Sequence, residues 1–164
     1  MIKQLKIQIL TMFALGYSKY APGSVASFVT CLIFICFYNF QINVLFLILG
    51  VILLFLFSVY SIDTLENSFS ETDAKEIVID EFIGQSIPVL TIYSFLDNKN
   101  IGVFILYTSV AFILFRLFDI WKPYPINKID KNMKNGFGVI LDDIVAGLYS
   151  VIILLMFIIF VDYV

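Results

Sequence analysis

The stretch INVLFLILGVILLFLFSVYSI, residues 42–62, is a continuous apolar run without a charged side chain. A helix needs about 20 such residues to cross the hydrocarbon core of a bilayer. Residues 139–161, VILDDIVAGLYSVIILLMFIIFV, form a second run of sufficient length. The chain of 164 residues is 61% apolar, against roughly 45–50% in soluble domains. A soluble protein of 164 residues cannot bury so much apolar surface in its own core. The sequence therefore predicts one membrane-embedded domain over residues 1–164.

Three shorter apolar stretches reach spanning length only if each takes a turn from its flanks: residues 25–38, 82–96 and 101–118. The second of them contains Gln85 and Pro88, and it either spans the bilayer or re-enters it. We therefore expect an all-α polytopic membrane bundle of about four to five spanning helices. Residues 1–16, with two lysines ahead of a short apolar stretch, predict an N-terminal interfacial helix.

The charged residues indicate how the chain sits in the membrane. With five crossings, nine of the ten basic side chains fall on the side of the N-terminus, and only Lys99 falls on the other. The positive-inside rule makes the basic side cytoplasmic. Eleven of the thirteen acidic residues, all but Asp97 and Asp162, fall on that same side. The connection 97–100 is expected to be tight.

Paired carboxylates stand at the membrane border in two of these stretches. Asp80 and Glu81 stand directly before the stretch 82–96, and Asp142 and Asp143 lie inside the start of the stretch 139–161. Ionisable groups at that depth are costly and usually face a polar cavity in the bundle. Asp143 also begins a helical stripe of small or polar residues that allows a neighbouring helix to approach closely: Asp143, Ala146, Gly147 and Ser150.

A polar edge lies at the end of the stretch 101–118. Arg116, Asp119 and Lys122 are spaced three apart, and Pro123 and Pro125 then stop the helix. An interfacial belt of snorkelling side chains explains Lys122 but not Asp119. The edge suits an anionic substrate handled with the help of a metal.

Glycine and serine mark two further segments. Gly23 and Ser24 precede the first spanning stretch, where Ser24 is a plausible N-cap and free amides can bind phosphate. The segment 136–138, Gly-Phe-Gly, is interpreted as a flexible connection.

The composition excludes several chemistries. The chain has no histidine, which removes Ser-His-Asp triads, phosphohistidine intermediates and His-ligated zinc. The net charge of −3 argues against nucleic acid as a partner. Carboxylates can instead hold Mg²⁺, and Arg116 and Lys122 can neutralise phosphate oxygens. The residues thus indicate phosphoryl transfer on a lipid with a phosphorylated headgroup.

The same segments resemble the phosphatidylglycerophosphatase A family, in the family's order along the chain: residues 21–24, 77–84, 115–126 and 136–147. The resemblance implies an all-helical, Mg²⁺-dependent enzyme of the bacterial inner membrane that converts phosphatidylglycerophosphate to phosphatidylglycerol, with its active site facing the cytoplasm. It makes five acids candidate catalytic and metal-binding residues: Asp80, Glu81, Asp119, Asp142 and Asp143. It makes Arg116 and Lys122 candidate phosphate contacts, to which the free amides at the start of the first spanning stretch add Gly23 and Ser24. Where the family commonly has Ala-Pro-Gly-Thr-x-Gly-Ser, this chain has Ser24 and Ala26.

Two alternatives stay open from the residues. A CDP-alcohol phosphotransferase also uses aspartates at a cytoplasmic membrane face, but its Asp-Gly-x-x-Ala-Arg core is missing. A small cation transporter would need acids through the depth of the bilayer, whereas none lies between Asn43 and Tyr60 or between Ile144 and Val161. The sequence does not assign which carboxylates bind metal and which one acts as base. The number of metal ions, the acyl-chain preference and the oligomeric state are equally open.

Overall fold

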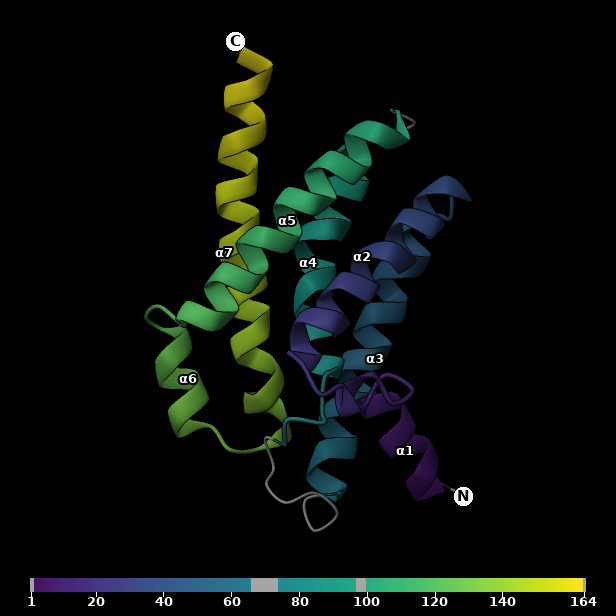
Figure 1. Cartoon of the computed structure of the whole chain (residues 1–164), viewed down its shortest axis with the longest axis vertical. Coiled ribbons are helices and arrows are strands. Elements are labelled where there is room, and N and C mark those ends of the chain that lie inside the picture. Colours follow the sequence, from purple (N-terminus) through teal and green to yellow (C-terminus); the bar gives the residue numbers. More distant parts are fainter. Residues whose placement is uncertain (1, 66–73, 97–99, 164) are drawn as a thin grey trace.

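The computed structural model describes residues 2–65, 74–96 and 100–163, with side chains up to residue 160. Within these ranges the chain is helical (Figure 1). Its elements are α1 (Ile2–Leu10), the 3₁₀ turn η1 (Leu15–Tyr17), α2 (Pro22–Asn39), α3 (Val44–Thr64), α4 (Ile79–Phe95), α5 (Ile101–Trp121), α6 (Ile126–Asn132) and α7 (Gly136–Tyr163). The predicted helical membrane bundle is confirmed. Lys99 and most of the connection 97–100 lie outside the described residues.

Four of the described helices are long and apolar enough to cross a membrane: α2, α3, α5 and α7 up to Phe160. The first stretch takes one more turn at its start, since α2 begins at Pro22. Asparagine caps two of these helices: Asn43 Oδ1 accepts from Leu45 N and Asn100 Oδ1 from Gly102 N. Capping by asparagine fits its strong preference at this position.

Helix α4 runs along the middle of the bundle between the other long helices (Figure 1). Its 17 residues extend about 26 Å at about 1.5 Å per residue. Near its end, Tyr93 Oη donates to the carbonyl of Phe37 (3.0 Å) in the last turn of α2 and to that of Ile42 (2.6 Å) in the α2–α3 connection. Tyr38 Oη donates to Leu96 O at 2.6 Å. The helix therefore passes from one end of the bundle to the other and does not turn back.

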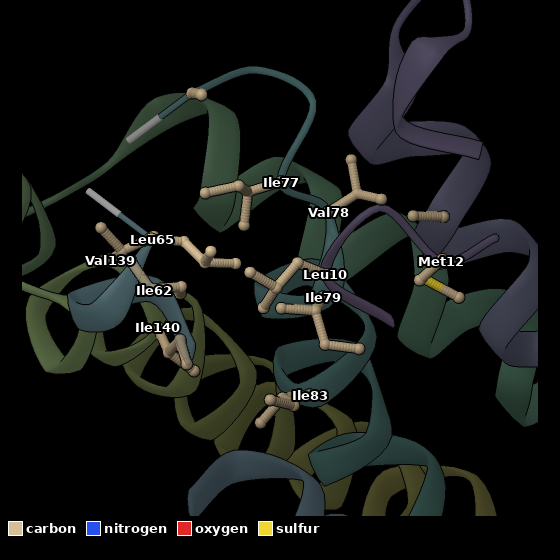
Figure 2. Packing of buried hydrophobic residues seen from close by; sticks show 12 residues of the cluster. Leu10, Met12, Ile62, Leu65, Ile77, Val78, Ile79, Ile83, Val139 and Ile140 are labelled. Atoms are coloured by element: carbon tan, nitrogen blue, oxygen red, sulfur yellow. The ribbon is translucent and has the colours of Figure 1, made fainter. Parts of the chain in front are cut away.

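An apolar cluster supports the start of α4 (Figure 2). It joins Leu10 at the end of α1, Ile62 of α3, Val78 before α4 and Ile140 of α7, all almost fully buried. Val78 N also donates to Leu10 O at 3.0 Å. Because this cluster ties four segments together, it sets the relative positions of the first turns of α4 and α7.

The interpretation of residues 136–138 as a flexible connection is wrong, because they form the first turn of α7. Gly136 N donates to Asp63 Oδ1 at 2.6 Å, and Gly138 N donates to Asn135 Oδ1 at 2.9 Å. A Cβ on Gly136 would lie 2.6 Å from Val59 O. These glycines allow α7 to begin in contact with the end of α3.

Candidate functional site

Three carboxylates meet at the end of the bundle where α4 and α7 begin. Asp80 and Glu81 lie in the first turn of α4, and Asp143 lies two turns into α7. One oxygen from each carboxylate lies within 4.8 Å of the other two. Asp80 is 9% exposed and Asp143 is 4% exposed. We call Asp80, Glu81 and Asp143 the acid group.

Two glycines bring the acid group together. A Cβ on Gly84 would lie 2.7 Å from Asp143 O, and a Cβ on Gly147 would lie 2.5 Å from Gly84 O. Pro88 has no N–H to offer the carbonyl of Gly84 along the helix, so this carbonyl is free to face α7. The predicted small-residue stripe is confirmed, since all four of its members are buried: Asp143, Ala146, Gly147 and Ser150.

Helix α5 adds an ion pair beside the acid group. Arg116 Nη1 lies 2.6 Å from Asp119 Oδ2, as the spacing of three along the helix allows. Gly23 of α2 connects this pair to the acid group: a Cβ there would overlap Glu81 Oε1 and lie 3.3 Å from Arg116 Nη1. The first turn of α2 therefore closes the site from a third side, with backbone in place of a side chain.

The prediction that Ser24 is the N-cap of the first spanning helix is wrong. The helix begins at Pro22, and Ala21 is the N-cap with a φ of 43°. Proline is well suited to the first helical position because its φ is already helical and its missing N–H needs no partner there. Ser24 thus lies inside the first turn, next to Gly23.

Lys122 turns away from the edge that the sequence predicted. The helix ends at Trp121, and Lys122 follows with a φ of 45°. Its Nζ lies 2.8 Å from Asp142 Oδ2 and 2.9 Å from Asp130 Oδ1. Burial of Lys122 lowers its pKa, but its hydrogen bonds to Asp142 and Asp130 outweigh this effect and hold the pKa above its ordinary value. An ammonium has three donors, so these two bonds leave at most one for a substrate.

Asp130 is the residue that sequence reasoning missed. It lies on α6, a helix of seven residues that was not predicted from the sequence. The signal was present as the turn-forming Pro123 and Pro125, followed by apolar Ile126 and Ile129 three residues apart. Too few residues follow to show a helical period.

The five predicted acids therefore divide into two kinds. Asp80, Glu81 and Asp143 crowd together, whereas Asp119 and Asp142 are each paired with a cation. Asp142 directly precedes Asp143 in α7, and Asp119 is paired with Arg116, which lies beside Glu81 at Gly23. Asp119 and Asp142 thus border the acid group and link it to Arg116 and Lys122.

The acid group fits a hard divalent cation. Its donors are all carboxylate oxygens, which is the ligand type that Mg²⁺ prefers. Glu81 Oε2 is buried without a hydrogen-bond partner in the described part of the chain. A buried charge in that state is costly unless a cation is close to it. Three crowded carboxylates and an unpaired oxygen are what a cation site requires.

Comparison with known proteins agrees with this chemistry. The sequence profile of the family described as phosphatidylglycerophosphatase A matches residues 8–158. The chain belongs to this family. It is therefore a membrane enzyme, a hydrolase that removes phosphate from a lipid. This membership favours the phosphatase over the phosphotransferase and the transporter that the residues left open.

Three curated relatives are similar to this phosphatidylglycerophosphatase A family member. A Bacteroides thetaiotaomicron protein named "Putative phosphatidylinositol-3-phosphatase" is 35% identical over 92% of this chain and 91% of its own length. Phosphatidylglycerophosphatase A of Escherichia coli K12 is 31% identical over 84% of this chain and 74% of its own. Phosphatidylglycerophosphatase A of Haemophilus influenzae is 41% identical over 49% of this chain and 45% of its own. No solved structure matches the chain significantly.

Proposed function

We propose that the protein is a Mg²⁺-dependent phosphatase that converts phosphatidylglycerophosphate to phosphatidylglycerol at the cytoplasmic face of the bacterial inner membrane. The observation that carries the proposal is the acid group, whose carboxylate oxygens lie within 4.8 Å of one another beside the guanidinium of Arg116. Family membership supplies the reaction class, and the names of the Escherichia coli and Haemophilus influenzae relatives support the substrate.

The acid group would hold the metal. Asp80, Glu81 and Asp143 supply three oxygen ligands, and water would complete the coordination, since Mg²⁺ usually keeps several waters. When bound, such an ion polarises a phosphate and lowers the pKa of bound water. The carboxylates themselves repel one another, so they bind a cation more readily than they bind a bare phosphate.

Arg116 would receive the substrate phosphate. Its side chain is 16% exposed, and its Nε is buried without a hydrogen-bond partner in the described residues. A guanidinium matches phosphate oxygens through paired donors. Asp119 holds the Arg116 side chain in place through the 2.6 Å contact. Arg116 can therefore offset the charge that develops on the phosphate oxygens.

The reaction consumes one water. The water oxygen bonds to phosphorus, the bond between phosphorus and the glycerol oxygen breaks, and that oxygen takes a proton to leave as the alcohol of phosphatidylglycerol. A carboxylate beside the phosphate accepts the proton of the attacking water. Asp119 suits this role best, because its partner Arg116 lies beside the acid group and the three carboxylates of that group would hold the cation.

Cytoplasmic placement is supported by charge. The end of the bundle that holds the acid group also holds Arg116 and Lys122, at the end of α5. With five crossings, this is the side that receives nine of the ten basic residues. Reconstituted in sealed vesicles, the enzyme should be cleaved by added protease within residues 119–138 only when that end faces outward.

A second substrate has its own support. The Bacteroides thetaiotaomicron relative, which matches nearly the whole chain, is named for phosphatidylinositol 3-phosphate. Both lipids present a phosphomonoester, so the site chemistry alone serves either one. Discrimination depends on groups that contact the headgroup beyond its phosphate.

One assay tests the proposal. The purified enzyme is given each lipid in mixed micelles, with Mg²⁺ or with EDTA, and inorganic phosphate is measured. Release from phosphatidylglycerophosphate with Mg²⁺, loss in EDTA and recovery on adding Mg²⁺ are expected. Full activity in EDTA would contradict the dependence on Mg²⁺. Faster release of phosphate from phosphatidylinositol 3-phosphate would contradict phosphatidylglycerophosphate as the preferred substrate.

A further inference from the structure

A groove of about 710 Å³ lies along one face of α5. All six of its lining residues belong to this helix: Phe112, Ile113, Arg116, Leu117, Ile120 and Trp121. The groove is shallow and open, because one helix alone lines it. Helix α5 is one of the four membrane-spanning candidates, and in Figure 1 it crosses in front of α4. The groove is therefore open to lipid.

One end of the groove reaches the acid group through Arg116. This arginine is the single charged residue among the six that line the groove. Its Nη1 also adjoins Gly23, whose other neighbour is Glu81 Oε1. Any phosphate held by Arg116 in the groove is thus next to the acid group.

The remaining lining residues suit an acyl chain. Phe112, Ile113 and Leu117 form an apolar surface toward the middle of α5, and Trp121 stands at its charged end, 71% exposed. Tryptophan at that position is typical of the headgroup level of a bilayer. Arg116 Nη1 is paired with Asp119 Oδ2 at 2.6 Å, and the 16% of its side chain that stays exposed contributes to the lining of the groove. The groove thus offers a cation at headgroup level and an apolar surface beside it, which complements an anionic phospholipid.

We infer that this groove binds one acyl chain of the phospholipid substrate with its phosphate against Arg116, so that the substrate reaches the acid group sideways from the bilayer across α5. The inference rests on the proposed function, because it places that substrate. It adds the route of entry and the chain-binding surface, and it makes Ile113 and Leu117 determinants of affinity for long-chain lipids.

Filling the groove tests the inference by activity. Leu117→Trp and Ile113→Trp should raise KM for long-chain substrate by about tenfold, equivalent to about 1.4 kcal/mol, with kcat little changed. A soluble short-chain form of the same lipid should be hydrolysed nearly as well as by the wild type. Leu53→Trp is the matched control, since Leu53 is an equally apolar exposed residue on α3 outside the groove. Equal effects on long and short chains, or on Leu53→Trp and Leu117→Trp, would overturn the inference.

A binding measurement separates this inference from the proposed function. Trp121 is the only tryptophan of the chain, so its fluorescence reports on the groove without turnover. Phosphatidylglycerol with brominated acyl chains should quench it more strongly than brominated phosphatidylcholine at the same mole fraction. Arg116→Gln should remove the difference.

The outcomes point in distinct directions. Selective quenching by an enzyme that hydrolyses neither candidate lipid would sink the proposed function and leave the groove as an anionic-lipid site. Equal quenching by both lipids would overturn the inference while hydrolysis stands. A dimer in detergent that dissociates in Leu117→Trp would also overturn it, because the groove would then be occupied by a second copy.

Discussion

Gly147 of α7 packs against the carbonyl oxygen of Gly84 in α4, so closely that a Cβ on Gly147 would lie 2.5 Å from that oxygen. In lipid, close backbone contact of this kind is a main source of helix association. Since Asp80 and Glu81 lie just before Gly84, and Asp143 lies one turn before Gly147, the contact sets the spacing of the acid group.

Gly147→Ala should therefore separate the two helices. We expect a loss of about 1–3 kcal/mol in the free energy of unfolding, as for other overpacked sites. Activity should fall further than stability, because displaced carboxylates no longer bind a cation together. Unfolding in mixed detergent and phosphate release measure the two effects.

Gly50→Ala is the control for this substitution. Gly50 also lies inside a spanning helix, α3, but a Cβ there meets nothing within 4 Å. Alanine should be neutral or stabilising by up to about 1 kcal/mol, because it lowers the entropy of the unfolded chain. A similar loss in both variants would mean that the α4–α7 contact is not the cause.

Removing one charge from the acid group should stop turnover while the fold persists. Asp143→Asn keeps the shape of the side chain and relieves repulsion from its acidic neighbours, so stability should be unchanged or higher. The rate should fall at least about a hundredfold, the scale of a lost catalytic group. Glu76→Gln removes an acid just before α4 and outside the acid group, and it should retain activity. Normal turnover by Asp143→Asn would exclude it from the site.

The long helices could be predicted from the sequence because an apolar run as long as residues 42–62 is typical of a helix that spans a bilayer. The position of Asp143 followed from its helical stripe, since the period of a helix places Ala146 and Gly147 on the same face. These inferences needed only local pattern. They located the acids near one end of the bundle but not in contact.

The contacts that build the site depend on residues far apart in the chain. The spacing of Lys122 from Asp119 suggested one polar edge, but the left-handed turn at Lys122 sends its side chain to Asp130 and Asp142 instead. Likewise, Gly136 was interpreted as flexible because its partner, Asp63, lies 73 residues away. Helical period carries no information about such pairs.

Mg²⁺ should stabilise the enzyme in the absence of substrate. A ligand that binds only the folded state adds about 2.7 kcal/mol at a hundred times its Kd, and here it also relieves the repulsion within the acid group. The unfolding midpoint of the wild type should therefore rise with Mg²⁺ concentration. Asp80→Asn should show little rise, whereas Glu76→Gln should respond as the wild type does. An equal rise in Asp80→Asn and wild type would place the ion elsewhere.

Lys122→Met should destabilise the end of the bundle by removing the cation between Asp130 and Asp142. Hydrogen bonds to charged groups contribute about 1.5–3 kcal/mol each at most sites, and partial exposure of Lys122 reduces the effect, so we expect a loss of about 1–3 kcal/mol. Asp130→Asn should cost less, since Lys122 keeps the better buried Asp142. Lys128→Met on the exposed face of α6 serves as control and should be nearly neutral.

The same lysine predicts a dependence on alkaline pH. Because the folded protein holds the pKa of Lys122 above its ordinary value, about 10.4 in an unfolded chain, its contribution is complete below that pH. It is lost as the pH rises through the folded pKa, when the unfolded state has already released its proton. The stability difference between wild type and Lys122→Met should thus stay constant from about pH 7 to 10 and narrow above about 10.4. Unfolding curves of the two proteins across that range measure it, and a difference that shrinks below pH 9 would contradict the raised pKa.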